Sequence, residues 1–342
     1  MTIFNLRTWY TRFFALLFIG ALYFVLVRSA DVGVAGLDTS FWGYRKLIAN
    51  YADLRLALGD RVFPNVLIGE DGWMIFTAER SMDDYQNSLA FSDEQIIEIT
   101  QGLAKLKSRL AARNATLLVV IAPNKPTVYP EIMPPGIEKF TQESRLERLT
   151  THLEQNLPGV LLDLRPILGD ARAVREVYYK TDTHWNDYGV YLVYQAILGE
   201  LAKTQPELVP FALEMFELQE AGLFLGDLAE NTGSVSLRES SLVVTPRFEN
   251  PAGYRELEAG PRRVLTAWTD NPQLPRLLMY HDSFGPRLFG LLGMHFEQAV
   301  SVPHYSGRPV WSLNWIEQHN PDVVLIQIAE RYLHDLAILL SQ

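Results

Sequence analysis

The chain has 342 residues, which is enough for one large domain or two modest ones. Hydrophobic residues make up 48% and charged residues 20%, a composition typical of a folded globular protein and not of a disordered one. The net charge is -10 and basic residues do not cluster, so we expect no nucleic-acid partner. The absence of cysteine excludes a disulfide scaffold, a cysteine nucleophile and thiolate-bound metals.

The first thirty residues contain an apolar run, residues 13–27, between Arg12 and Arg28. With flanking aromatic residues it is long enough to cross a bilayer as a helix. We expect residues 1–30 to be a cytoplasmic N-terminus and an uncleaved transmembrane signal anchor. Because the positive charges precede the run, the remainder is expected in the periplasm, tethered to the inner (cytoplasmic) membrane. A cleaved signal peptide with a site near residues 33–35 is the alternative.

Residues 31–60 are interpreted as a linker and helical lead-in, with helical character over 42–62. A hairpin is predicted over 66–76, where apolar runs flank a glycine-containing turn. Ser92, with Gln95 three residues later, is a capping box that opens a helix with apolar residues at helical spacing.

From residue 61 to residue 342, buried strands alternate with helices. The apolar run at 116–122 is typical of a buried parallel strand. Residues 206–265 are more β-like, without a helical period. Further strands are predicted at 160–164, 277–280 and 323–328, and helices at 142–157, 186–202 and 286–296. This order predicts an α/β three-layer sandwich with a mostly parallel sheet, whose ligand site lies at the carboxyl ends of the strands.

Ser283 follows one of these strands directly, in His281-Asp282-Ser283-Phe284-Gly285, and a helix comes next. A serine in a tight strand-to-helix turn presents its hydroxyl and its main-chain N–H at the sheet edge. Such a turn provides a nucleophile and one oxyanion donor. The alternative is that Ser283 only caps the helix.

Asp182 and His184 form a second candidate pair in Thr181-Asp182-Thr183-His184. In an extended loop, residues two apart face the same side. The Asp182 carboxylate is then in reach of Nδ1 of His184, which leaves Nε2 free as a base. Aspartate and histidine are also ligand types for zinc or manganese, and four such residues are candidates here: Asp182, His184, His281 and Asp282. Since no histidine pair has helical ligand spacing, we expect no metal.

Taken together, these residues resemble the alginate O-acetyltransferase family, the AlgJ and AlgX group of SGNH-hydrolase-like polysaccharide O-acetyltransferases. Several segments follow the family's order, and Thr181-Asp182-Thr183-His184-Trp185-Asn186 is the most specific of them. The matching stretches are VLIGEDGWMIF at 66–76, VIAPNKPTVYPE at 120–131, YKTDTHWN at 179–186, GDLA at 226–229, DSF at 282–284 and AERYL at 329–333.

The resemblance implies an SGNH-hydrolase-like domain over 61–342 with a permuted motif order, because the Asp-x-His precedes the serine. It implies that Ser283 accepts an acetyl group, that His184 is the base and that Asp182 supports it. It also implies an exported polysaccharide acceptor, alginate or similar, and a multi-spanning membrane acyltransferase that supplies acetyl groups. His281 departs from the family, which has a basic residue before the Asp-Ser-Phe.

Further oxyanion or substrate contacts are predicted for four residues: Tyr305, Asn124, Lys125 and Trp185. No cofactor is expected. Two other functions are open from the sequence: a polysaccharide acetyl esterase that uses the same triad, and a non-catalytic polysaccharide-binding subunit of a secretion complex.

Overall fold

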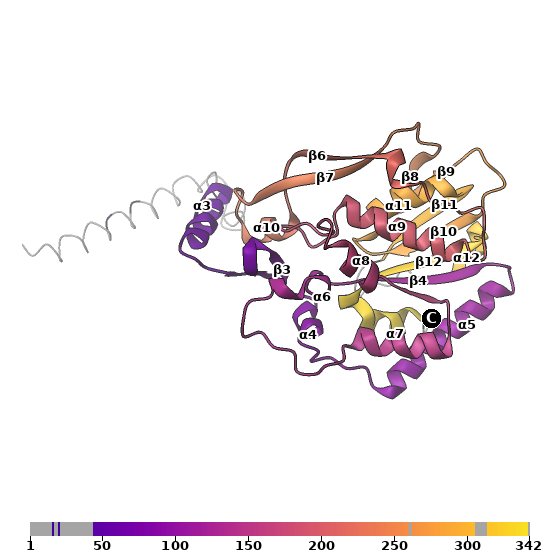
Figure 1. The fold of residues 1–342 in the computed structure, drawn as a ribbon, viewed down its shortest axis with the longest axis horizontal. Coiled ribbons are helices and arrows are strands. Elements are labelled where there is room, and N and C mark those ends of the chain that lie inside the picture. The colour runs from indigo at the N-terminus through magenta and orange to yellow at the C-terminus, as the bar shows by residue number, and fades with distance from the viewer. Residues whose placement is uncertain (1–15, 17–19, 21–43, 260–261, 305–312, 341–342) are drawn as a thin grey trace, which may run out of the picture. The chain divides into compact units, whose positions relative to one another are not determined.

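The computed structural model describes Leu16, Gly20 and residues 44–259, 262–304 and 313–340 (Figure 1). The chain divides into two units. The larger unit contains residues 61–232 and 237–340. In the smaller unit the structure describes Leu16, Gly20, residues 44–60, which contain helix α3 (Tyr44–Ala57), and residues 233–236. Within it, the hydroxyls of Ser234 and Ser236 donate to Oδ1 of Asp53 on α3, over 2.5 and 2.7 Å.

A seven-stranded sheet forms the centre of the larger unit (Figure 1). Its four neighbouring pairs from β5 to β11 are parallel, whereas β11–β9 and β9–β8 are antiparallel. The parallel strands are almost continuous apolar runs because both of their faces are covered. The strands in spatial order are β5 (Leu161–Asp163), β4 (Thr116–Ala122), β12 (Val323–Ala329), β10 (Arg276–His281), β11 (Gln298–Pro303), β9 (Arg262–Trp268) and β8 (Gly253–Ala259).

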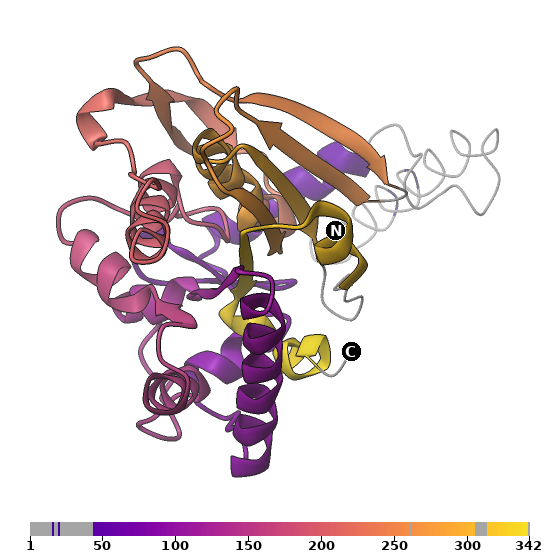
Figure 2. The same cartoon turned by 90° about the vertical axis from the view of Figure 1, so that its right-hand side faces the viewer.

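Helices cover both faces of this sheet, so the larger unit has three layers. Helices α5 (Asp93–Ala111), α7 (Arg145–Asn156) and α13 (Leu333–Leu340) pack together on one face. Helices α9 (Asp187–Leu201) and α11 (Gly285–Leu292) pack together on the other, and Figure 2 shows the layers from the side. Helices α8 (Arg165–Ala171) and α12 (Leu313–His319) complete the layers.

Local sequence explains the longest of these helices. The Ser92 hydroxyl accepts from the main chain of Gln95, and the Gln95 side chain accepts from the main chain of Ser92. This capping box satisfies two N–H groups that a helix start leaves without partners. One stripe of α5 is buried against the sheet layer, formed by Ile96, Ile99, Leu103, Leu106 and Leu110.

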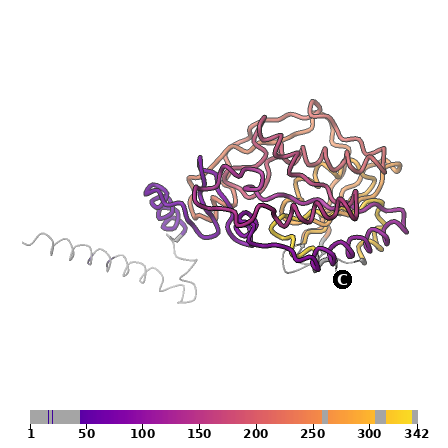
Figure 3. The backbone as a smooth tube through the Cα atoms, turned by 60° about the horizontal axis from the view of Figure 1, so that its bottom comes forward, coloured from indigo at the N-terminus to yellow at the C-terminus, as the bar shows by residue number. Residues whose placement is uncertain are grey.

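Smaller elements surround the carboxyl ends of the parallel strands. Strands β1 (Val62–Phe63), β2 (Val66–Ile68) and β3 (Met74–Phe76) form an antiparallel sheet, and β6 (Phe216–Leu225) pairs with β7 (Arg238–Pro246) in a two-stranded ribbon. The short helices are α4 (Ser81–Tyr85), α6 (Lys125–Val128) and α10 (Asp227–Thr232). Figure 3 follows the chain through these elements.

The predicted α/β sandwich is present, and the sheet is parallel over five strands. Its other edge is antiparallel, so the sheet is mixed, because the β-like residues 253–259 and 262–268 pair as antiparallel strands beside β11. Strand β11, which the sequence did not predict, lies next to β10. The predicted membrane helix lies outside the described residues, apart from Leu16 and Gly20. None of the helices in the described part of the chain is long and apolar enough to span a bilayer.

Candidate active site

The loop formed by residues 180–184 lies near the carboxyl ends of the central strands and is held mainly through its main chain. The Glu239 carboxylate on β7 accepts from the N–H groups of Lys180 and Thr181, over 2.9 and 2.7 Å. On the other side, the Lys180 carbonyl accepts from the Met74 N–H over 2.9 Å and from Nζ of Lys125 over 3.1 Å. The ribbon, the small sheet and α6 thus all position this loop.

The Gly-Asp-Leu-Ala segment at 226–229 provides a further attachment. The N–H groups of Leu228 and Ala229 donate to the Thr181 carbonyl over 3.1 and 3.0 Å. A β-carbon at residue 226 would come within 2.2 Å of the Thr181 carbonyl oxygen. Only glycine therefore permits this approach. The segment carries little information as a motif, but in the structure it holds the loop 180–184 in place.

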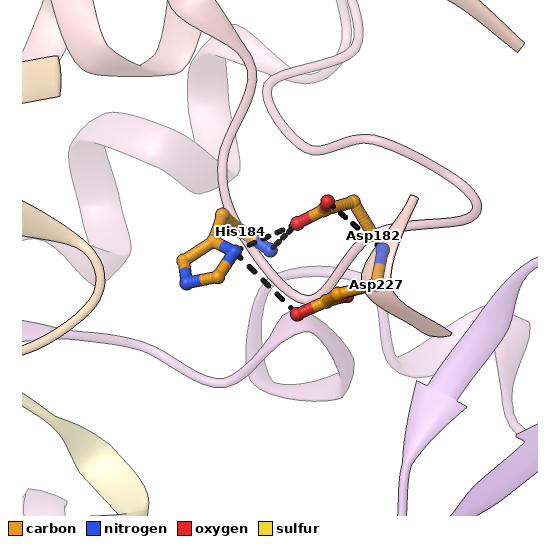
Figure 4. A group of neighbouring side chains, drawn as sticks. All are labelled: Asp182, His184 and Asp227. Atoms are coloured by element: carbon orange, nitrogen blue, oxygen red, sulfur yellow. Dashed lines mark hydrogen bonds and ion pairs between the residues drawn. The ribbon is translucent and has the colours of Figure 1, made fainter. Parts of the chain in front are cut away.

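Asp182 and His184 have the geometry that their spacing predicts (Figure 4). Nδ1 of His184 donates to Oδ1 of Asp182 over 2.7 Å, and the same oxygen accepts from the His184 main-chain N–H over 2.9 Å. Because the carboxylate accepts at Nδ1, the neutral ring has no hydrogen at Nε2. Nε2 is shielded from water and has no hydrogen-bond partner among the described residues. It is therefore available to accept a proton.

Asp227 is a third member of this group that the sequence did not identify. Its Oδ2 lies 3.7 Å from Nδ1 of His184, and its main-chain N–H donates to Oδ2 of Asp182 over 3.1 Å (Figure 4). Burial raises the pKa of Asp227, and the nearby charge of Asp182 raises it further. For Asp182, burial acts in the same direction, but the hydrogen bonds and charge of His184 outweigh it and hold the pKa at about 2. Asp182 is thus the stronger acid of the two carboxylates.

Ser283 stands at the turn between β10 and α11. The carboxylate of the preceding Asp282 is buried and organises this turn. Oδ1 of Asp282 accepts from the Phe284 N–H over 2.9 Å and from the Gln327 amide over 3.0 Å, and Oδ2 accepts from the Ala329 N–H. Asp282 thereby attaches the turn to β12, while Ser283 itself is exposed.

His281 lies beneath this turn and is 3% exposed. Nδ1 of its ring donates to the Asp282 carbonyl over 2.7 Å, and Nε2 accepts from the Ser301 hydroxyl over 2.6 Å. Burial lowers the pKa of His281, with a smaller opposing effect from Asp282. Both ring nitrogens are engaged in the interior, so this histidine supports the turn and does not face a substrate. A β-carbon at residue 285 would meet its ring at 2.2 Å, which explains the glycine there.

One cavity of about 170 Å³ brings Ser283, His184 and Asp182 together. The other residues that line it are Tyr179, Trp185, Phe284, Pro286 and Arg287. Arg287 donates to the Tyr179 hydroxyl over 3.1 Å and pairs with Asp187. Three larger cavities, of about 350 to 360 Å³, are lined by described residues that include no histidine. They offer no serine–histidine pair, so the smaller cavity is the candidate active site.

Asn124 and Lys125, predicted to contact the oxyanion or the substrate, do not share the cavity that contains Ser283, His184 and Asp182. Nζ of Lys125 is buried and donates to the carbonyls of Met74 and Lys180, over 2.8 and 3.1 Å. The Asn124 side chain is buried against Asp84, with 3.4 Å between Nδ2 and Oδ2. Neither residue lines the cavity that contains Ser283. Their polar atoms hold neighbouring segments together, and the predicted substrate contacts of both stay a prediction.

Trp185 lines the cavity but is only 1% exposed, and its ring packs edge-on against Phe284 with 4.9 Å between ring centroids. Packing in the core, rather than stacking on a sugar, is therefore its evident role. Tyr305 lies outside the described residues, and its predicted contact stays a prediction.

Asp182, His184 and Asp227 have ligand atoms within 4.8 Å of one another, which is close enough for a metal ion. However, a proton occupies the contact between Nδ1 of His184 and Oδ1 of Asp182, since 2.7 Å is a normal hydrogen-bond length. The set comprises one imidazole and two carboxylates. Both oxygens of Asp182 and Oδ1 of Asp227 also accept a main-chain N–H. This arrangement fits an oriented imidazole better than a metal centre.

Comparison with known proteins identifies the family. Residues 66–255 match the model of the SGNH hydrolase-like domain of the acetyltransferase AlgX. The match covers more than half of the chain and includes Asp182, His184 and Asp227. The protein therefore belongs to the SGNH hydrolase-like AlgX acetyltransferase domain family, the group that its sequence motifs resemble.

Two curated relatives are described as probable alginate O-acetylase AlgJ. The protein of Azotobacter vinelandii is 30% identical over 148 residues, which cover 41% of this chain and 34% of the relative. The protein of Pseudomonas aeruginosa is 26% identical over 260 residues, which cover 73% of this chain and 57% of the relative. The chain thus spans about a third to somewhat over half of the length of these relatives.

Solved structures show the same fold. Bacillus cereus PatB1, determined with a sulfonyl adduct, is 16% identical and aligns with a TM-score of 0.57 over 78% of this chain and 97% of PatB1. The O-acetyltransferase domain of Pseudomonas putida AlgJ is 17% identical, with a TM-score of 0.50 over 81% of this chain and 99% of that domain. At these identities the likeness establishes an SGNH-hydrolase-like α/β fold and nothing finer.

Proposed function

We propose that this protein is an O-acetyltransferase that uses Ser283, His184 and Asp182 to acetylate hydroxyl groups of an exported polysaccharide. The observation that carries the proposal is the shared cavity. There an exposed serine at a strand-to-helix turn lies with a histidine whose Nδ1 is held by a carboxylate and whose Nε2 has no partner. Family membership supports acetyl transfer as the reaction.

In the first half-reaction, Oγ of Ser283 attacks the carbonyl carbon of an acetyl ester donor, and its proton passes to Nε2 of His184. The bond between the acetyl carbon and the donor oxygen then breaks, and the leaving oxygen takes the proton from His184. The main-chain N–H of Ser283 is the proposed donor to the oxyanion. Asp182 stabilises the imidazolium and keeps the ring in the required tautomer.

In the second half-reaction, a sugar hydroxyl gives its proton to Nε2 of His184 and attacks the acetyl group on Ser283. The ester bond to Oγ breaks, Oγ recovers the proton, and the acetylated sugar leaves. A bound hydroxyl has an effective concentration of about 10⁵ M or more, far above that of water at about 55 M. A positioned glycan can therefore outcompete hydrolysis even in a cavity that water enters.

The polysaccharide is proposed to be alginate or a similar exopolysaccharide, because both curated relatives are described as probable alginate O-acetylases. The acetyl donor is proposed to be supplied by a multi-spanning membrane acyltransferase, as the family resemblance implies. A donor on the cytoplasmic side of the membrane requires such a relay if the reaction takes place in the periplasm.

The proposed location is the periplasmic face of the inner membrane, with residues 1–30 as a transmembrane anchor. The support is the apolar run at 13–27, and Arg7 and Arg12 that precede it. Fusion of a periplasm-specific reporter to the C-terminus tests this orientation, and activity of a cytoplasm-specific reporter there contradicts it.

The function is tested with the full chain, an activated acetyl ester and a panel of oligosaccharides. Mass spectrometry should locate an acetyl group on Ser283, and Ser283→Ala should abolish both labelling and turnover. Ser108→Ala, at an exposed position on α5, is the matched control. Acetylated sugar should form at the expense of free acetate for at least one glycan. Release of acetate that no glycan suppresses, together with deacetylation of an acetylated polymer, would identify an esterase.

A further inference from the structure

Asp227 makes three contacts with the loop that carries His184, although it comes from the first turn of α10. Its main-chain N–H donates to Oδ2 of Asp182 over 3.1 Å. Its Oδ1 accepts from the Thr183 N–H over 2.6 Å. Its Oδ2 then lies 3.7 Å from Nδ1 of His184. One residue thus fixes the orientation of Asp182, attaches the loop and places a second carboxylate beside the imidazole.

The distance of 3.7 Å determines what this second carboxylate can do. It is too long for a hydrogen bond, so among the residues that the structure describes Asp182 remains the acceptor of the Nδ1 proton. The same 3.7 Å is close enough for a strong attraction between opposite charges, because that energy falls slowly with distance. An ionised Asp227 therefore has little interaction with a neutral ring and a strong one with the imidazolium that forms when Nε2 takes a proton. Interactions that grow as charge develops accelerate the chemical step, unlike those present throughout.

Other charged groups near the His184 ring also contribute to the electrostatic potential that acts on it. Asp182 is on the loop itself, and Arg287 of α11 lines the cavity. Lys125 of α6 and Glu239 of β7 hold the neighbouring Lys180, and Arg331 lies 5.5 Å from the Phe284 ring that packs on His184. Of these charged groups, Asp182 and Asp227 are the carboxylates that lie within 4 Å of Nδ1.

We propose that Asp227 is a second positioning carboxylate for His184, which orients Asp182 through its main chain and stabilises the protonated imidazole through its side chain. This inference rests on the proposed function for its catalytic consequence. The placement itself does not depend on which acyl donor or acceptor the protein uses. Asp227 does not line the cavity with Ser283, so a role in binding substrate is not part of the proposal.

The first test measures His184 directly, without a catalytic assay. The full chain, labelled in its histidine rings, is titrated by NMR as wild type, as Asp227→Asn and as Glu230→Gln. Asparagine keeps the main-chain N–H and an oxygen that can accept from Thr183, so it removes the charge selectively. Glu230 is an exposed carboxylate one turn along the same helix and is the matched control.

Asp227→Asn should move the titration midpoint of the His184 ring down by about one pH unit or more, the usual effect of losing an adjacent opposite charge. Glu230→Gln should leave it within a few tenths of a unit. An unchanged midpoint in Asp227→Asn, in a variant that melts like wild type, overturns the proposal. If Asp227→Asn does not fold, Asp227→Glu is measured in its place. Glutamate retains the negative charge, so a His184 midpoint that falls by one pH unit in this variant also overturns the proposal.

The second test uses turnover of an activated acetyl ester. Asp227→Asn should lower kcat about tenfold to a hundredfold and leave KM within about twofold, because the charge acts on the imidazolium and not on bound substrate. A purely structural role would instead lower the fraction of active enzyme and the melting temperature together. If Ser283 is never acylated but the His184 midpoint still moves, the proposed function fails while the placement of Asp227 stands.

Discussion

The Thr181 carbonyl and residue 226 approach each other so closely that a β-carbon at that position would lie 2.2 Å from the oxygen. Real β-carbons do not come so near to another heavy atom. The carbonyl accepts from two N–H groups of α10, so it has no room to move away. We therefore expect Gly226→Ala to displace the loop that carries Asp182 and His184.

The expected result for Gly226→Ala is a loss of turnover of at least about a hundredfold, because a displacement of about 1 Å at a reacting group has that scale of effect. The melting temperature should fall as well. Gly222→Ala is the control, since a β-carbon there meets no other atom within 4 Å. Equal activity of the two variants in an acetyl ester assay would show that the loop tolerates the shift.

Asp182→Asn should leave the fold intact and lower turnover on the order of 10⁴-fold, the scale observed when a triad histidine is held in the wrong tautomer. The amide can donate to Nδ1, which would place the ring hydrogen on Nε2 and remove the base. Circular dichroism checks the fold, and single-turnover acylation measures the loss. Chelators should have no effect on wild type. Inactivation by a chelator, with recovery on adding zinc or manganese, would instead support a metal at Asp182, His184 and Asp227.

Lys125→Met should reduce both stability and turnover. The variant loses the Nζ donor to the carbonyls of Met74 and Lys180, and an unpaired buried polar group costs about 1–3 kcal/mol. Lys180→Met is the control, because this neighbouring lysine lies over the same Trp73 ring but is 38% exposed. Chemical denaturation should place the Lys180 variant near wild type and the Lys125 variant clearly below it. The reverse order would rule out the attachment by Lys125.

Glu330→Gln should change how stability depends on pH. Burial, and then the charge of Asp84, raise the pKa of the Glu330 carboxyl to about 7. A carboxyl with a raised folded-state pKa binds a proton on folding, so the free energy of unfolding falls as pH rises from the unfolded value of 4.5 to about 7. Glutamine does not titrate and removes this decrease.

The free energy of unfolding of Glu330→Gln, measured relative to that of wild type, should therefore rise by on the order of 2–3 kcal/mol between about pH 5 and about pH 8. Its amide oxygen can accept the same hydrogen bonds that Asn124 and Thr127 donate to the carboxylate. Denaturant titrations at the two pH values provide the measurement, and Glu317→Gln, at an exposed position, is the control. A difference between variant and wild type that is the same at both pH values would contradict the assignment.

The sequence predicted those parts of the fold that have a strong local signature. Strands β4 and β12 are almost continuous apolar runs, with Gln327 the one polar residue inside β12, and the capping box of α5 lies within four residues. Strand β11 was not predicted because Ser301 and Pro303 interrupt its apolar character. Ser301 is buried there because it donates to His281, a partner that no local pattern reveals.

In the candidate site, too, the contacts between residues close in sequence were predicted and the contacts between distant residues were not. Asp182 and His184 are two residues apart, so their contact follows from local geometry, and Ser283 follows from its place after a strand. Asp227 contacts His184 across a separation that no spacing rule covers. Lys125 was predicted to contact substrate because a lysine after a strand end has the position of a substrate-binding residue. The structure instead encloses it between two main-chain carbonyls.

The place of β12 in the sheet has a consequence for how the chain acquires its structure. This strand lies between β4 and β10, and Asn124 after β4 is joined to Glu330 after β12, 206 residues later. During synthesis β4 therefore has an open, apolar edge until almost the whole described chain has emerged. Pairing between segments so distant in the chain slows folding, and exposed strand edges promote association between molecules. We expect refolding from denaturant to be slow, to lose yield as protein concentration rises, and to improve when a holdase chaperone is present.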